Sequence, residues 1–197
     1  AGNVGNTAWS NTIVGFQSMH GPSSSAGAVN ITGYYNATLG DRTLKANTTG
    51  HHNVAINHGA LNANTTGNQN IAIGSLANQN NTIGDNNIAM GTNCLQVNVH
   101  GDSNVAIGTN SLYSLAPADG AGRNIAIGTS SGKFLTTGLS NIFIGASSGQ
   151  GITGAKLTGS NNTCVGDDSG LLLQGAAQYN TLMGSTAGDA ITTGSQN

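Results

Sequence analysis

Apolar residues recur along this chain in a short phrase of Asn, three mostly apolar residues and Gly. Its Asn occurs at positions 11, 36, 53, 70, 87, 104, 124, 141, 162, 180 and 197. The four steps from residue 36 to residue 104 are each 17 residues long, and the other steps are 17 to 25 residues long. A fixed period of this kind predicts a stack of structural repeats. Such rods serve as scaffolds or binding surfaces.

The phrase itself predicts a short strand. With its Asn as position 0, positions +1 and +3 are mostly β-branched and share one side of a strand, whereas +2 points to the other side. The side chains expected to form the structural repeat core are Ile71, Ile73, Ile88, Val105, Ile107, Ile125, Ile127, Ile142 and Ile144. Because both sides are apolar, we expect a strand buried on both faces, one inside a coil and the other against a second layer or chain.

Glycines predict where each coil turns. Position +4 is Asn57 in one repeat and Gly in the other complete repeats, and both residue types tolerate positive φ. The turn glycines of the later repeats are Gly74, Gly91, Gly108, Gly128, Gly145, Gly166 and Gly184. Position +7 is small, +8 is mostly Leu or Gly, and a second Gly is common at −3. Each repeat is therefore expected to contain a strand, a turn, a short second strand and another turn.

These features predict an all-β fold, a parallel β-roll or β-solenoid with repeats of about 17 residues. The whole chain, residues 1–197, is expected to form this single domain. Longer steps place insertions near residues 20–29, 113–122 and 149–157, and we expect them to project from one side of the rod. Position +2 changes from Ala to Phe143, Cys164 and Leu182. We therefore expect the packing of that face to widen or change partner beyond residue 140.

Composition narrows the classes of function. Only 6% of residues are charged and the net charge is −2, so nothing favours nucleic acid or an anionic membrane as a partner. No apolar run is long enough for a membrane span. The chain has no initiator Met and ends on the Asn of another phrase, which leads us to expect a fragment of a longer fibre. Glu is absent, and this weakens any hypothesis of acid–base catalysis. We expect no enzyme.

Few side chains suggest chemistry. Cys94 and Cys164 fall at repeat positions that suit small buried side chains, and they are about four repeats apart, too far for a disulfide. His51, His52 and His58 flank one strand. They would hold a metal only if symmetric chains brought them together, and the usual zinc spacings are absent. We therefore expect no metal and no cofactor, and we interpret the adjacent Asp167 and Asp168 as turn residues.

Four aromatic residues are the candidate ligand-binding residues. Tyr34, Tyr35, Tyr113 and Phe134 lie outside the central strand positions and near insertions. Exposed rings there could stack on sugars. The alternative is that these rings cover the edges of repeats or the terminal coils. Six glycosylation sequons also occur, and they matter only in a host that glycosylates Asn. They lie at Asn30, Asn36, Asn47, Asn64, Asn80 and Asn161.

The phrase Asn104-Val-Ala-Ile-Gly108, followed by small residues, resembles the head repeats of trimeric autotransporter adhesins. The segment Gly67-Asn-Gln-Asn-Ile-Ala-Ile-Gly74 is also similar to repeats in phage tail fibres. The resemblance covers nearly the whole chain from Asn11 onward. It implies a homotrimer of β-rolls around one axis, and it implies an extracellular location on a virion or a bacterial cell surface. It carries over no catalytic residue.

The expected function is therefore a fibre segment of a surface attachment protein. It would act as a stiff spacer and bind a host cell-surface glycan or protein receptor. A homotrimer also has a physical motive, because a second apolar strand face needs a partner and cyclic symmetry supplies one. Two other classes remain open. One is an ice-binding solenoid, and the other is a self-assembling extracellular filament that grows through its exposed terminal strands.

Overall fold

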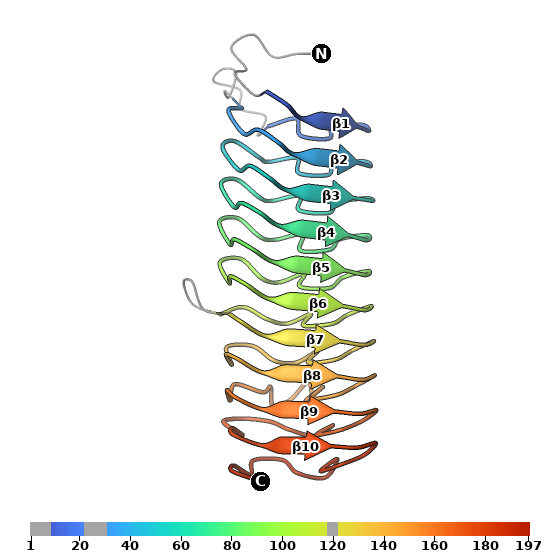
Figure 1. Ribbon diagram of the computed structural model, residues 1–197, viewed down its shortest axis with the longest axis vertical. Coiled ribbons are helices and arrows are strands. Elements are labelled where there is room, and N and C mark those ends of the chain that lie inside the picture. Colours follow the sequence, from blue (N-terminus) through green and yellow to red (C-terminus); the bar gives the residue numbers. More distant parts are fainter. Residues whose placement is uncertain (1–8, 22–30, 118–121) are drawn as a thin grey trace.

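The computed structural model describes residues 9–21, 31–117 and 122–197, and the strands of this part form one rod-shaped sheet (Figure 1). Ten strands of three residues pair in chain order. Their bounds are β1 Thr12–Val14, β2 Ala37–Leu39, β3 Val54–Ile56, β4 Ile71–Ile73, β5 Ile88–Met90, β6 Val105–Ile107, β7 Ile125–Ile127, β8 Ile142–Ile144, β9 Thr163–Val165 and β10 Thr181–Met183. The protein is an all-β solenoid, as the repeat predicts. We call each of its coils a rung.

Every strand pairs with the next one in parallel and in the same repeat register. Val54 of β3 lies opposite Ile71 of β4, which in turn lies opposite Ile88 of β5. The register survives the longer steps, since Val105 of β6 still pairs with Ile125 of β7. Insertions are therefore accommodated outside the strands, and equivalent residues form straight columns along the rod.

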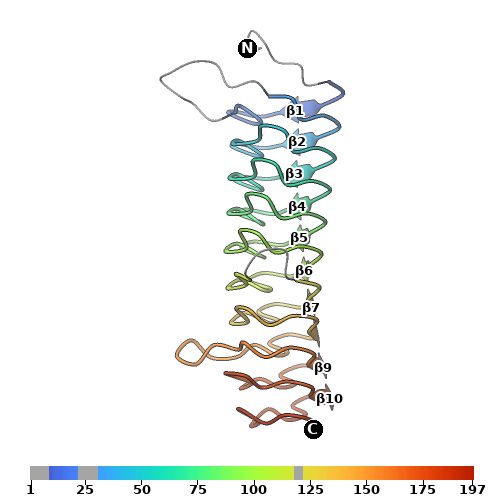
Figure 2. The same ribbon diagram turned by 90° about the vertical axis from the view of Figure 1, so that its left-hand side faces the viewer.

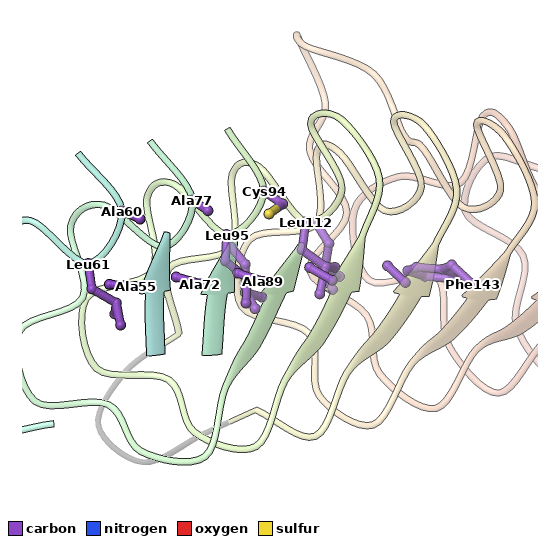
Figure 3. Close-up of a cluster of buried hydrophobic side chains, with 14 of the residues drawn as sticks. Ala55, Ala60, Leu61, Ala72, Ala77, Ala89, Cys94, Leu95, Leu112 and Phe143 are labelled. Atoms are coloured by element: carbon purple, nitrogen blue, oxygen red, sulfur yellow. The ribbon is translucent and has the colours of Figure 1, made fainter. Parts of the chain in front are cut away.

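The interior of the coil contains position +2 of the strand, together with the small residue at +7 and the residue at +8. Ala55, Ala60 and Leu61 represent these positions in one rung, and all three are fully buried. Figure 3 shows this packing over successive rungs, with Ala72, Ala89 and several leucines directed into the coil. The small alanines leave room for the leucines, so a narrow coil is filled without large aromatic side chains.

The residues predicted as the repeat core lie on the outside of the coil. In the single chain, Ile107, Ile127, Ile142 and Ile144 are each 36–37% exposed. The other members of that predicted core are half-buried, namely Ile71, Ile73, Ile88, Val105 and Ile125. The prediction is wrong for the single chain, because the alternation of the strand places the small +2 residue inside and both large neighbours outside.

The short second strand predicted for each rung is also absent from the described residues. Positions +5 to +10 form turns in which +6 and +8 both have positive φ, as in Asn93 (58°) and Leu95 (51°). Backbone bonds to the next rung persist through the turn, for example from the Leu95 N–H to the Ser111 carbonyl at 3.1 Å. Left-handed residues bend the chain sharply while these contacts between rungs remain.

The predicted turn glycines at position +4 are confirmed. All seven have φ between 119° and 135°, and Asn57 takes this position with φ of 86°. Space is a second constraint, because a Cβ on Gly74 would lie 2.6 Å from the carbonyl oxygen of Gly91 in the next rung. The backbone conformation and the close approach of successive rungs thus both favour Gly there.

Buried asparagines at position 0 form a hydrogen-bonded ladder along the rod. The backbone N–H and side-chain amide of Asn87 donate to Oδ1 of Asn70 at 2.9 and 3.2 Å. The amide also donates to the Gly101 carbonyl at 2.8 Å. In turn, Oδ1 of Asn87 accepts from the N–H and amide of Asn104 at 3.0 and 3.1 Å. The phrase therefore begins with Asn because this side chain satisfies buried polar groups of three rungs.

A second asparagine column runs beside the first at position +11. Its members are Asn47, Asn64, Asn81 and Asn98, all fully buried. The Asn64 amide donates to Oδ1 of Asn47 at 3.1 Å, and the Asn81 amide donates to Oδ1 of Asn64 at 2.9 Å. Both columns meet at the glycine carbonyls of position −3. The two ladders together tie the first and last parts of each coil to one another.

The interior changes composition along the rod. The rung that begins at Asn53 combines a strand Ala with Leu61 and Asn64, whereas the rung that begins at Asn162 combines Cys164 with Gly170 and Leu173. Phe143 of β8 packs against two glycines at position +8, Gly132 of the preceding rung and Gly149 of its own rung. A Cβ on Gly132 would lie 2.8 Å from Cδ2 of the Phe143 ring. Inside the coil the residues packed around position +2 change from Leu to Gly, beginning with Gly132, while the strand register stays uniform through β10.

The insertion near 149–157 forms a small hairpin that projects from the rod. Ile152 and Ala155 make an antiparallel bridge, and Leu157 returns to pair with Leu135 and Gly175. Figure 2 shows this segment extending from the side opposite the strands. Of the other two insertions, residues 22–29 and 118–121 lie outside the described part of the chain.

Candidate functional site

The outer face of the strands carries about half of the exposed large hydrophobic residues of the described chain. We define the strand face as positions +1 and +3 of β1–β10. Every residue there is Ala, Val, Ile, Leu, Met or Thr, with no charged side chain. Its most exposed members include Val14 (53%), Leu39 (53%) and Met183 (70%). β-branched side chains give this face two stiff columns.

The strand face is long and narrow. Ten strands at about 4.8 Å spacing give a length of about 43 Å and a width of roughly 12 Å, hence about 500 Å². The largest apolar patch of an ordinary monomer measures about 300–600 Å² and is often functional. Because the register is constant, the two columns are straight, and a second straight column could pack along them rung by rung.

The predicted ligand residues Tyr34 and Tyr35 belong to an aromatic cluster beside β1–β3. The Tyr34 ring stacks on Trp9 with centroids 5.2 Å apart and on His51 at 4.8 Å. Tyr35 meets Trp9 edge-on at 4.9 Å and His52 at 5.0 Å. Since both faces of the Tyr34 ring are covered, it offers no platform for a sugar. This column fits the alternative in which aromatic rings cover the edges of rungs.

The histidines of this region pair with neighbours. His51 Nδ1 and His52 Nδ1 are 2.9 Å apart, and Nε2 of His58 lies 3.5 Å from a carboxylate oxygen of Asp41. The described residues contain no group of three or more His, Cys, Asp or Glu side chains that could hold a metal. The chain by itself therefore brings only two of the three histidines together.

Tyr113 and Phe134 lie in the turns of successive rungs, on the part of the coil that follows the strand. Both are half-buried, and Nζ of Lys133 lies 5.0 Å from the centroid of the Phe134 ring. They are at least four rungs from Tyr34 and Tyr35, about 20 Å along the rod. The structure thus separates the four predicted ligand residues into two places.

The two cysteines are free and fully buried, which confirms their interpretation as small interior residues. The Cys94 thiol donates to the Gly91 carbonyl at 2.9 Å. Burial raises the pKa of Cys94 and of Cys164 to about 12, so neither is a thiolate at neutral pH. The turn interpretation of Asp167 and Asp168 also holds, with Asp168 at a φ of 55° after β9.

The asparagines of the glycosylation sequons differ in burial. Asn36, Asn47 and Asn64 are buried within the two ladders, where their amides donate hydrogen bonds. Asn80 and Asn161 are exposed, and Asn30 lies outside the described residues. Of the five sequon asparagines within the described residues, only Asn80 and Asn161 are accessible for modification in the folded chain.

Comparisons with known proteins add no relationship. No protein-family model matches the chain, and neither the curated proteins nor the solved structures include a match. Within residues 9–21, 31–117 and 122–197, no helix is long and apolar enough to cross a membrane. The functional argument therefore depends on the geometry of the rod and its surfaces.

Sequence reasoning found the residues of the strand face but assigned them to the core. A signal for the correct side was present in the correlated changes inside the coil. In three repeats Ala at +2 accompanies Leu at +8, whereas in the last three complete repeats Phe143, Cys164 and Leu182 at +2 accompany Gly at +8. The repeat between them combines Ala126 with Gly132, and Phe143 of the next rung lies against that glycine. Two positions that exchange volume in this way share one space, which places +2 inside and leaves +1 and +3 outside.

Proposed function

We propose that this chain is a fibre segment of a surface attachment protein and that it assembles as a homotrimer through the strand face. The observation that supports this most directly is the absence of any charged side chain from that face over ten strands, with Thr12, Thr163 and Thr181 as its hydroxyl-bearing members. Leaving about 500 Å² of such surface in water is unfavourable by about 25 cal/mol per Å². A permanent partner of equal length removes this cost.

Another copy of the chain is the partner that fits best. Two rods laid side by side in parallel have the same rung spacing, so their columns stay matched from one end to the other. Cyclic symmetry closes such an assembly and leaves no strand face uncovered. Three copies with their strand faces directed toward a common axis would also carry the hairpin at residues 151–157 on the outside of the fibre.

Such an assembly would be a stiff spacer that presents contacts to a receptor. Each rung is bonded to the next through backbone, asparagine ladders and interior side chains, a linear arrangement typical of repeat rods. The proposed location is extracellular, on a virion or a bacterial cell surface, and the proposed receptor is a host glycan or protein. We propose no catalytic activity and no contact with nucleic acid.

Light scattering on the purified chain tests the assembly. A mass near three times 19.5 kDa is expected for the unchanged chain. Substituting Ile107→Lys and Ile127→Lys places two charges on the strand face, and we expect this variant to dissociate. Asn80→Lys adds a charge at an exposed turn position and should retain the trimer mass. A monomeric unchanged chain, or a trimeric Ile107→Lys/Ile127→Lys variant, would contradict the proposal.

One observation favours an ice-binding solenoid as a second candidate. Thr92, Thr109 and Thr129 occupy position +5 in three successive rungs, are exposed, and follow the strand face closely in sequence. A flat array of regularly spaced methyl and hydroxyl groups is what such a surface requires. A monomer that shows thermal hysteresis in freezing assays would support this candidate over the fibre. Concentration-dependent fibre growth would instead support a filament.

A further inference from the structure

A column of side chains runs along the turns that follow the strands, at position +9. Adjacent members of this column touch, since Nε2 of Gln96 donates to Oε1 of Gln79 in the preceding rung at 3.0 Å. Tyr113 and Lys133 are the next two members. The Ser114 N–H donates to the Lys133 carbonyl at 3.0 Å, which fixes the two rungs side by side. Tyr113 and Lys133 thus occupy the same position of adjacent rungs.

Phe134 extends this pair into a mixed aromatic and cationic surface. The ammonium of Lys133 lies 5.0 Å from the centroid of the Phe134 ring, within the range of a cation–π contact. Both residues are half-buried. Each residue therefore keeps part of its surface in contact with solvent. No other described aromatic ring of the chain has a lysine placed over it.

The projecting hairpin borders the same surface. The Leu157 N–H donates to the Phe134 carbonyl at 3.1 Å, so the returning strand of the hairpin lies against the Phe134 rung. Leu157 is fully buried and anchors it, while the preceding Lys156 is exposed. At the tip, a Cβ on Gly154 would meet no atom within 4 Å. Figure 2 shows that this hairpin is the part of the described chain farthest from the strands on that side.

We infer that Tyr113, Lys133, Phe134 and Lys156 form a binding site for an acidic saccharide. This inference rests on the proposed attachment function and names the class of ligand. The faces of sugar rings pack on aromatic side chains, and lysine ammonium groups bind carboxylates as point charges. The site holds two of the five Lys and Arg residues of the chain. In the rungs of β6 to β9, no Asp among the described residues lies at positions +9 to +13, although Asp167 and Asp168 lie at positions +5 and +6 of the β9 rung. A trimer would carry three such sites facing outward, which increases avidity for a repeating polymer.

Isothermal titration calorimetry on the full chain tests the site. The probes are a hexamer of galacturonic acid and sialyllactose as carboxylated sugars, with neutral maltohexaose for comparison. We expect the acidic probes to bind at least about 10-fold more tightly than the neutral one. Binding should weaken when the salt concentration is raised, because exposed charges are screened.

Matched variants test which side chains bind the acidic saccharide. Lys133→Ala/Lys156→Ala should lower the affinity for the acidic probes by at least about 10-fold, and Phe134→Ala should lower it about 5-fold. Lys45→Ala is the control, because Lys45 occupies the same repeat position in an early rung but is followed by Ala46 and has no hairpin beside it. This control should bind within about 2-fold of the unchanged chain.

Three results would overturn the inference. They are absence of binding to both acidic probes, equal affinity for neutral maltohexaose, and unchanged affinity in Lys133→Ala/Lys156→Ala. Light scattering separates this failure from failure of the proposed assembly. Substitutions at Lys133, Phe134 and Lys156 should leave the trimer mass unchanged, whereas substitutions on the strand face should not. A trimer that binds no acidic probe refutes only the site, and a monomer that binds it refutes only the assembly.

Discussion

At the residue scale, Asn87 illustrates why each repeat phrase begins with asparagine. Its amide and carbonyl oxygen serve buried groups of the rungs before and after it. We expect Asn87→Ala to lower the free energy of unfolding by about 2–4 kcal/mol, because it removes the oxygen that accepts from both the Asn104 N–H and the Asn104 side-chain amide. The Gly101 carbonyl keeps the Asn98 amide as a donor. Urea denaturation measures this change. Asn80→Ala at an exposed position should alter stability by less than about 0.5 kcal/mol, and equal effects for the two variants would refute the role of the ladder.

Asn78 is an exception inside the coil. It lies at position +8 between Leu61 and Leu95, is fully buried, and has no hydrogen-bond partner for its Nδ2 or Oδ1. We expect Asn78→Leu to stabilise the chain by about 1–2 kcal/mol, because it removes unpaired polar atoms and adds apolar burial. Its φ of 47° is close to the 51° of both leucines, so the backbone already suits Leu. The reverse change, Leu95→Asn, should destabilise the chain in the same denaturation experiment.

The cysteines give a pH dependence of defined sign. Burial raises the pKa of both thiols from 9.0 to about 12 in the folded chain. Their contribution to stability is therefore complete below pH 9 and declines as the pH rises from 9 toward 12, because only the unfolded state ionises readily. Replacing both cysteines with Ser or Ala should reduce this loss in denaturation curves at pH 8 and 10.5. Thiol reagents at pH 8 should react with them only after unfolding, and rapid reaction of the native chain would contradict their burial.

At the element scale, the middle of each strand and the turn that follows it act as one packing unit. Phe143→Ala should cost about 3–5 kcal/mol, because it empties a fully buried site. Gly149→Leu alone should also destabilise, since even a Cβ there would clash with the Phe143 ring. The double variant recreates the Ala and Leu combination of the earlier rungs. Gly149 has φ of 56°, close to that of Leu95, so the double variant should recover a substantial part of the lost stability in urea denaturation.

If the double variant is no more stable than the sum of the two single changes predicts, the two positions do not share one space. A control in an early rung separates this result from a general effect of Leu in turns. Gly59→Leu introduces Leu at position +6 rather than +8, where its Cβ would approach Leu76 instead of a strand residue. This control should show no rescue by any change in β3.

The elements that sequence predicted correctly are those fixed by local chemistry. The 17-residue period determined the strands, and the glycines at +4 determined one turn through their tolerance of positive φ. The inner and outer faces of the strand could not be assigned from hydrophobicity, because Ala106 inside and Ile107 outside are both apolar. The second strand was predicted wrongly because leucines such as Leu95 adopt positive φ, which local preference disfavours and the bonding between rungs enforces.

The candidate site was also predictable only in part, because its contacts form between rungs. Tyr113 and Phe134 were chosen because they are aromatic and lie near insertions, and the structure places them in successive rungs. Nothing in the spacing indicated that Tyr34 would be sandwiched between Trp9 and His51. Contacts between rungs depend on residues 17 to 25 positions apart in the chain, and their ring orientations follow from the fold alone.

At the scale of the whole molecule, each rung is stabilised by its contacts with the adjacent rungs. The middle rungs have neighbours on both sides, whereas the rung of β10 has a partner strand on one side only among the described strands. Many of its turn residues after Met183 are exposed. We expect backbone amides after residue 184 to exchange with solvent faster than those of β5–β7 in hydrogen-exchange experiments. Uniform exchange along the chain would indicate all-or-none unfolding of the rod.

The asparagine ladders also contribute a dipole moment along the axis of the rod. Backbone hydrogen bonds between rungs run both ways, as the bonds from Val54 to Asn70 and from Gly74 to Ile56 show. Most ladder amides instead donate from a later rung to the earlier one, as Asn87 does to Asn70 and Asn64 does to Asn47. Aligned amide dipoles add and polarise one another. A rod with a net charge of only −2 is therefore expected to carry a permanent dipole along its length, with the positive end at β1, and to orient in an applied field.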